Sequence, residues 1–179
     1  MKQEQFLGSS IYKSIISRKV NDPYEFSSFK ELKNLSSRRK GLEMEKIFEY
    51  IAKSYGFEVS NKKIDDGTPS SDYDRICQNK KIEIKGSFLW EGVNTFRWQQ
   101  IRTNQKYDYI IFLAFYPEEV KCYYASKQDV ISNLTVQDSK GNWVYNQHGG
   151  KKVNSGTFCI DGVPSNFSWM KEFDYHTLF

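Results

Sequence analysis

The sequence predicts one α/β domain in which a mixed central sheet of about four to five strands is flanked by helices. Three observations predict this class. Apolar residues recur at helical spacing over residues 41–55, and shorter segments with a period of two follow them. The run Tyr109–Phe115 is almost continuously apolar, which is typical of a strand covered on both faces. With 179 residues, including 13 Phe, 12 Tyr and 4 Trp, the chain is long and apolar enough for one core.

Charge and cysteine content limit the partners and the compartment. The net charge of +4 permits a polyanionic partner without requiring one. The three cysteines are widely spaced and form no CxxC pair, which fits neither a disulfide framework nor a four-ligand zinc site. No apolar run approaches the roughly 20 residues of a membrane span. We therefore expect a cytoplasmic protein without a membrane partner.

The chain is expected to begin with a peripheral helical segment over residues 1–40, in which Ser10 and Ser28 cap short helices. The strongest element is a helix from about Gly41 to Tyr55, and Gly56 is the glycine that typically follows a helix. Strands and helices are then expected in alternation. The expected strands are Phe57–Val59, Asp74–Gln78, Lys81–Lys85, Tyr109–Phe115, Val120–Tyr124 and Thr157–Ile160, and the expected helices are Thr95–Arg102 and Ser126–Ile131.

The segment Ser71–Ser87 predicts a β-hairpin with charged residues on one face. If Asn79–Lys80 forms a two-residue turn, Asp74 pairs with Lys85. Side chains alternate along a strand, so Asp74, Glu83 and Lys85 then project from the same face. That face presents a pair of carboxylates beside an amine.

Two carboxylates beside a lysine suit the hydrolysis of phosphodiester bonds. Mg²⁺ prefers one or two carboxylates together with water and phosphate oxygens, so Asp74 and Glu83 are the expected ligands, with Mn²⁺ as a substitute ion. Lys85 is expected to orient or deprotonate the attacking water and to stabilise the developing charge. Asp72 shares the face of Asp74 and is the alternative metal ligand. The other interpretation is that Glu83 and Lys85 are exposed residues of an edge strand.

Asp74 followed by Glu83-Ile84-Lys85 resembles the D and ExK of the PD-(D/E)XK nuclease superfamily, which includes type II restriction endonucleases, Holliday-junction resolvases and repair nucleases. Glu45 matches the acidic residue that this superfamily commonly supplies from the helix before the first strand. The resemblance covers about residues 41–130, and Tyr73 stands where the motif has proline. It implies a restriction endonuclease-like core with Glu45 as an auxiliary acid; the alternative for Glu45 is a surface position on its helix.

The resemblance also implies a function. We expect a Mg²⁺-dependent DNA endonuclease, most simply a type II restriction endonuclease that cuts both strands of double-stranded DNA at a specific sequence. Cleavage at a palindrome implies a homodimer, and restriction implies a cognate DNA methyltransferase as a partner. Residues 41–131 are then the catalytic core, and residues 132–179 contact DNA and complete the sheet. The candidate DNA contacts are Arg97, Gln99, Gln100, His148, Lys151 and Lys152.

Two alternatives stay open. A structure-selective or repair nuclease, similar to a Holliday-junction resolvase, uses the same chemistry without reading bases. A non-catalytic DNA-binding module keeps the fold, although the intact set of Asp74, Glu83 and Lys85 argues against it.

Overall fold

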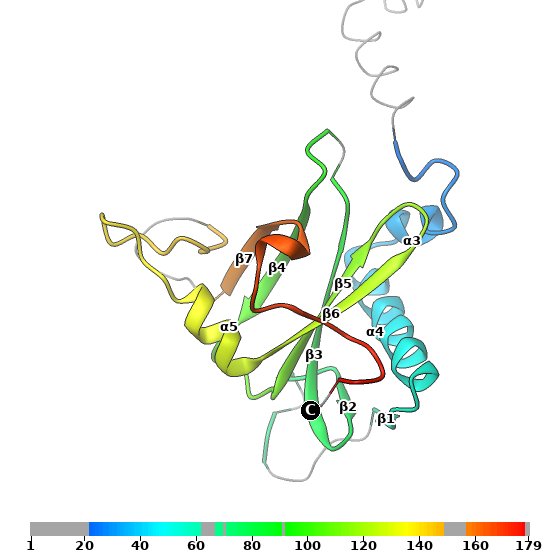
Figure 1. Cartoon of the computed structure of the whole chain (residues 1–179), viewed down its shortest axis with the longest axis horizontal. Helices are drawn as coiled ribbons and strands as arrows, with labels where there is room; N and C mark the ends of the chain where they lie inside the picture. The colour runs from blue at the N-terminus through cyan, green and yellow to red at the C-terminus, as the bar shows by residue number, and fades with distance from the viewer. Residues whose placement is uncertain (1–21, 62–66, 70, 91, 149–156, 178–179) are drawn as a thin grey trace, which may run out of the picture.

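The computed structural model describes residues 22–61, 67–69, 71–90, 92–148 and 157–177. A main sheet crosses the molecule, with helix α4 against one face and a small second sheet and helix α5 against the other (Figure 1). The α/β class predicted from the sequence is confirmed. Within the described ranges, no helix has both the length and the apolar character that crossing a membrane requires.

The main sheet has six strands in the order β1-β2-β3-β5-β6-β8. Strands β3 and β5 run parallel and the other described pairs are antiparallel, so the sheet is mixed as predicted. The expected size of about four to five strands is too small, because the two-residue edge strand β8 carries no periodic pattern. The strands are β1 Val59–Ser60, β2 Arg75–Cys77, β3 Lys80–Phe88, β5 Tyr109–Phe115, β6 Val120–Ser126 and β8 Lys171–Glu172.

A second, two-stranded sheet pairs β4 (Phe96–Arg102) with β7 (Thr157–Gly162). The helix predicted over Thr95–Arg102 is therefore wrong. A β-bulge between Trp98 and Ile101 shifts the register and leaves both of these residues buried. This spacing of three imitates a helical period, which explains the error.

Three α-helices lie in the described part of the chain: α3 (Lys30–Asn34), α4 (Ser37–Ser54) and α5 (Lys127–Leu134). The helix predicted from Gly41 is confirmed as α4, although it begins four residues earlier at Ser37. The predicted cap at Ser126 is also confirmed, since its side chain accepts a hydrogen bond from the Asp129 backbone in a capping box. A short 3-10 helix covers Pro164–Asn166, and the helix expected at Ser10 lies outside the described residues.

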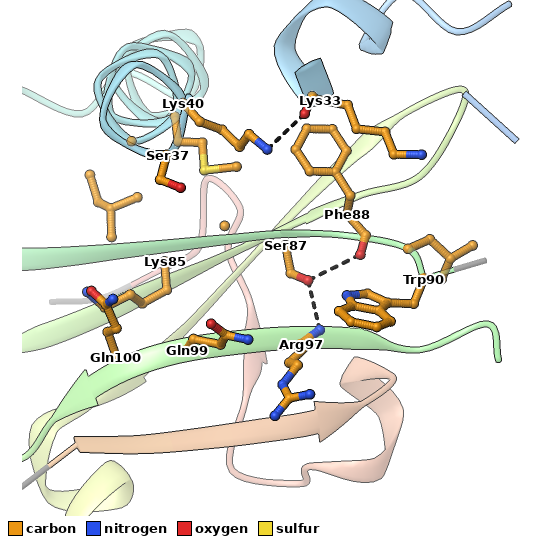
Figure 2. A pocket seen from close by; sticks show the side chains of 15 residues that line it. Lys33, Ser37, Lys40, Lys85, Ser87, Phe88, Trp90, Arg97, Gln99 and Gln100 are labelled. Carbon is orange, nitrogen blue, oxygen red and sulfur yellow. Dashed lines mark hydrogen bonds between the residues drawn. The ribbon is translucent and has the colours of Figure 1, made fainter. Parts of the chain in front are cut away.

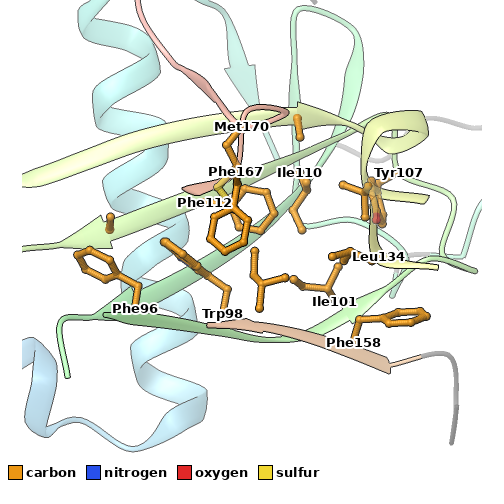
Figure 3. Packing of buried hydrophobic residues seen from close by; sticks show 14 of the residues in the cluster. Phe96, Trp98, Ile101, Tyr107, Ile110, Phe112, Leu134, Phe158, Phe167 and Met170 are labelled. Carbon is orange, nitrogen blue, oxygen red and sulfur yellow. The ribbon is translucent and has the colours of Figure 1, made fainter. Parts of the chain in front are cut away.

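Two hydrophobic cores lie on opposite faces of β3 and β5, as expected for a strand buried on both sides. Ile111 and Leu113 face α4, whereas Ile110 and Phe112 face the second sheet and α5. Figure 3 shows this second core. Side chains alternate in the same way along β3: Ile82 and Ile84 face α4, and Glu83 between them faces the second sheet. The members of the second core that Figure 3 labels are Phe96, Trp98, Ile101, Tyr107, Ile110, Phe112, Leu134, Phe158, Phe167 and Met170.

Candidate active site

The hairpin of β2 and β3 forms, but its turn lies one residue earlier than predicted. Gln78 and Asn79 occupy the turn with positive φ values of 51° and 62°, and Cys77 pairs with Lys80. Ile76 consequently faces Lys81 instead of Glu83. Moving the turn by one residue changes the partner of each β2 residue by two positions on β3. A change of two positions keeps each side chain on the same face of the sheet, so Asp74, Glu83 and Lys85 still share the predicted face.

Asp74, Glu83 and Lys85 lie together at the end of this hairpin. The Ile84 N–H donates to Asp74 Oδ2 at 2.8 Å, which fixes the Asp74 carboxylate against β3. Lys85 Nζ donates to Glu83 Oε1 at 2.5 Å. Glu83 is 5% exposed, so the structure does not support the interpretation of it as a solvated edge residue.

In this cluster the carboxylates of Asp74 and Glu83 lie near each other and are poorly solvated, so their negative charges repel each other. Burial is the main cause that raises the pKa of Glu83 to about 7, and the negative charge of Asp74 adds to it. Lys85, and to a lesser degree Arg102, oppose this shift. Burial, followed by the charge of Glu83, also raises the pKa of the Tyr107 hydroxyl. An added cation would relieve the repulsion between the carboxylates.

The donor set fits a hard, hydrated metal ion. Two carboxylates are sufficient for Mg²⁺ when water and phosphate oxygens complete its coordination. In the described ranges no three His, Cys, Asp or Glu side chains group into a larger metal site. If this cluster holds an ion, Asp74 and Glu83 are the residues that would hold it.

Glu45 of α4 forms an ion pair with Arg75 of β2. Arg75 also lies 3.6 Å from the Glu49 carboxylate and donates to the Asp74 carbonyl oxygen at 2.9 Å. Arg75 faces α4 because its partner in the ladder is Ile82. The structure thus connects Glu45 to Asp74 through Arg75.

Asp72, the alternative ligand, is hydrogen-bonded to the loop that contains Lys106. Its Oδ2 accepts a hydrogen bond from the Lys106 backbone at 3.0 Å. Next to it, the Gln105 side chain donates to the Ser71 carbonyl oxygen at 2.6 Å. Asp74 is therefore the residue that pairs with Glu83.

A groove of about 710 Å³ runs along β3 between α4 and β4, and Lys85 lies at one end of it (Figure 2). It opens where the β2 ladder stops, at the pair Arg75–Ile82. Its described lining includes four cationic residues and no acidic one. The residues labelled in Figure 2 are Lys33, Ser37, Lys40, Lys85, Ser87, Phe88, Trp90, Arg97, Gln99 and Gln100.

Three of the candidate DNA contacts line this groove: Arg97, Gln99 and Gln100. The bulge of β4 gives Gln100 a positive φ of 57°, and its N–H donates to Gln147 Oε1 at 2.8 Å. His148 is exposed but is not among the groove residues. Lys151 and Lys152 lie outside the described residues.

The sequence did not indicate Lys33 or Trp90 as site residues. Lys33 belongs to a five-residue helix and Trp90 follows the end of β3, so neither belongs to a motif. Both reach the groove through tertiary packing alone.

Comparison with known proteins adds little to this geometry. No family model and no curated protein matches the sequence. Among solved structures, a bacterial homing endonuclease is similar over 55% of this chain and 74% of its own, with a TM-score of 0.42 and 19% sequence identity. A likeness of this extent assigns no function to this chain.

Proposed function

We propose that this protein is a metal-dependent DNA endonuclease that hydrolyses phosphodiester bonds. The observation that carries the proposal is the buried Glu83 beside Asp74 and Lys85 at the end of a cationic groove. Buried carboxylates that repel each other cost stability, and such sites are typically functional. A groove lined by lysines supplies the attraction for a polyanionic substrate.

Each residue of the cluster has a role in this proposal. Asp74 and Glu83 hold Mg²⁺, for which Mn²⁺ substitutes, and the ion supplies Lewis acidity and a more acidic bound water when present. Asp74 is fixed for this role by the Ile84 N–H. Lys85, held by Glu83, orients or deprotonates the attacking water and stabilises negative charge on the phosphate. Glu45 acts indirectly, by anchoring Arg75 against the Asp74 backbone.

The finer proposal is a type II restriction endonuclease that acts on double-stranded DNA. In this proposal Arg97, Gln99 and Gln100 contact the substrate from β4, since arginine and glutamine read base edges in the major groove. His148, Lys151 and Lys152 would add contacts from the carboxy-terminal region. Cleavage of both strands would require a homodimer, and a cognate methyltransferase would protect the host site.

A structure-selective nuclease is the second candidate. It is favoured by an exposed tryptophan, Trp90, in the groove, because exposed aromatic rings are typical of sites that bind unpaired bases.

Digestion of several plasmids of known sequence with Mg²⁺ tests the proposed function. Wild-type protein should cut DNA, Lys85→Ala should reduce cutting at least about 100-fold, as is typical for loss of one group that stabilises transition-state charge, and EDTA should abolish it. Lys46→Ala, an exposed lysine of α4 outside the groove, is the matched control and should cut normally. Discrete fragments would support restriction. Absence of cutting with either Mg²⁺ or Mn²⁺ would contradict an endonuclease.

A further inference from the structure

Trp90 differs from the other tryptophans of this protein. It is 52% exposed, whereas Trp98 is fully buried and Trp143 and Trp169 pack against the second core. It lies at the opposite end of the groove from Lys85 (Figure 2). What sets Trp90 apart is its place: its exposed ring lies in the lining of the cationic groove, where a ligand that enters the groove can reach it.

The backbone around Trp90 is held in place. The Trp90 N–H donates to the Thr95 carbonyl oxygen at 2.8 Å, and the Asn94 N–H returns to the Trp90 carbonyl oxygen at 3.2 Å. The preceding residue, Leu89, donates to the buried Tyr24 hydroxyl at 2.8 Å. The guanidinium of Arg97 lies 6.0 Å from the ring centroid. The ring is therefore presented from an anchored segment, which reduces the entropy lost when a ligand stacks on it.

The groove wall next to Trp90 carries positive charge. Lys40 Nζ donates to the Lys33 carbonyl oxygen at 2.8 Å and lies 5.4 Å from the centroid of Phe88. Burial and the charge of Lys33 lower the pKa of Lys40, so these two ammonium groups repel each other. Lys33 has a carboxylate partner in Asp22, at 2.6 Å. A phosphate group beside Lys40 would balance its charge.

We propose that this groove binds a single nucleic-acid strand, with its phosphates along Lys40 and Lys85 and with an unpaired base stacked on Trp90. Inside a duplex both faces of a base are already stacked on neighbouring bases. An aromatic ring on the protein therefore gains a stacking partner only where a base is unpaired or lies at an end. This inference rests on the proposed nuclease function. It assigns the substrate class as DNA in which the cleaved strand has an unpaired segment next to the cleaved bond.

Binding without metal ions tests this proposal independently of cleavage. In EDTA, fluorescently labelled oligonucleotides of equal length are compared as a perfect duplex, a duplex with an unpaired tail, and a single strand. Wild-type protein should prefer the two unpaired forms. Trp90→Ala should weaken their binding about tenfold, since stacking of one base contributes on that order, and should change duplex binding less than about twofold. Trp90→Phe should restore most of the affinity.

Tyr50→Ala is the matched control, because Tyr50 is an exposed aromatic residue of α4 that does not line the groove. It should leave all three affinities unchanged. Tryptophan fluorescence gives a second readout: single-stranded DNA should quench wild-type emission, and Trp90→Phe should remove that quenching. Circular dichroism of each variant confirms that it is folded.

The outcomes separate this inference from the proposed function. A preference for unpaired DNA that depends on Trp90 supports the inference even if no divalent ion produces cleavage. Equal affinity of Trp90→Ala and wild type, or an equal loss on duplex and unpaired DNA, overturns the inference even if the plasmid assay shows cutting.

Discussion

Glu83 is the residue through which the pH dependence of stability and the proposed metal site can be tested together. Its pKa is raised from 4.5 to about 7, so the folded protein binds this proton more tightly than the unfolded chain does. The stabilisation that the proton brings is complete below the unfolded pKa and is lost as the pH rises through about 7. Without metal, the wild-type protein should therefore lose stability between mildly acidic and mildly alkaline pH.

Glu83→Gln should remove this pH dependence, because the amide keeps the shape and carries no charge. At alkaline pH in EDTA the variant should be more stable than the wild type, by on the order of 1 kcal/mol for each unit by which the pKa was raised. Urea denaturation of both proteins at two pH values measures this difference. Identical pH profiles would show that Glu83 does not carry the effect.

Added Mg²⁺ provides the complementary test of the same residue. Mg²⁺ should raise the stability of the wild type at alkaline pH, since a ligand that binds only the folded state stabilises it. The ion should do this much less for Glu83→Gln, which lacks a ligand. DNA cleavage by the variant should be lost although its fold is more stable, as is common for residues selected for function.

The packing of α4 on β3 places the end of the Met44 side chain against Gly86. A Cβ added at Gly86 would lie 2.3 Å from Met44 Sδ. Gly86→Ala should destabilise the protein by about 1 kcal/mol, the low end of the overpacking range, because the flexible end of Met44 must shift to make room. In the double variant with Met44→Ala, the loss should be smaller than the sum of the two single losses, because the shortened side chain makes room for the methyl group. Denaturation midpoints of the four proteins measure the coupling, and strict additivity would contradict this contact.

Secondary structure was predictable where the pattern is local. The apolar spacing within α4, the continuous run of β5 and the cap of α5 each lie within one short segment, and all three were found. Strand β4 was not, because its bulge depends on a partner strand more than fifty residues away. The number of strands in the main sheet was underestimated for the same reason, since β8 is a strand only because it pairs with β6.

The charged cluster was predictable because side chains alternate along a strand, and an error of two positions in the register does not change the face on which they lie. Asp74, Glu83 and Lys85 keep a common face although the turn was misplaced. The sequence predicted that Glu45 lies on a helix, but it could not predict which residue Glu45 contacts. Its contact with Arg75 depends on how α4 crosses β2. The groove could not be predicted at all, because α3, α4, β3 and β4 contribute its residues together.

The whole molecule carries a net charge of only +4, so any strong attraction for DNA must come from local concentration of its cations. The described lining of the groove contains four cations. Lys33, Lys85 and Arg97 are paired with carboxylates, whereas Lys40 Nζ donates to a backbone carbonyl oxygen, so Lys40 is the cation chosen for the test. A protein that neutralises phosphates releases counterions, and its affinity therefore falls linearly with salt on logarithmic axes. Each lost phosphate contact should reduce that slope by about one.

Affinity measured by fluorescence anisotropy between roughly 50 and 200 mM salt should thus show a shallower slope for Lys40→Gln than for the wild type. Lys46→Gln, which removes an equal charge outside the groove, should leave the slope unchanged. Equal slopes for all three proteins would show that DNA does not occupy the groove.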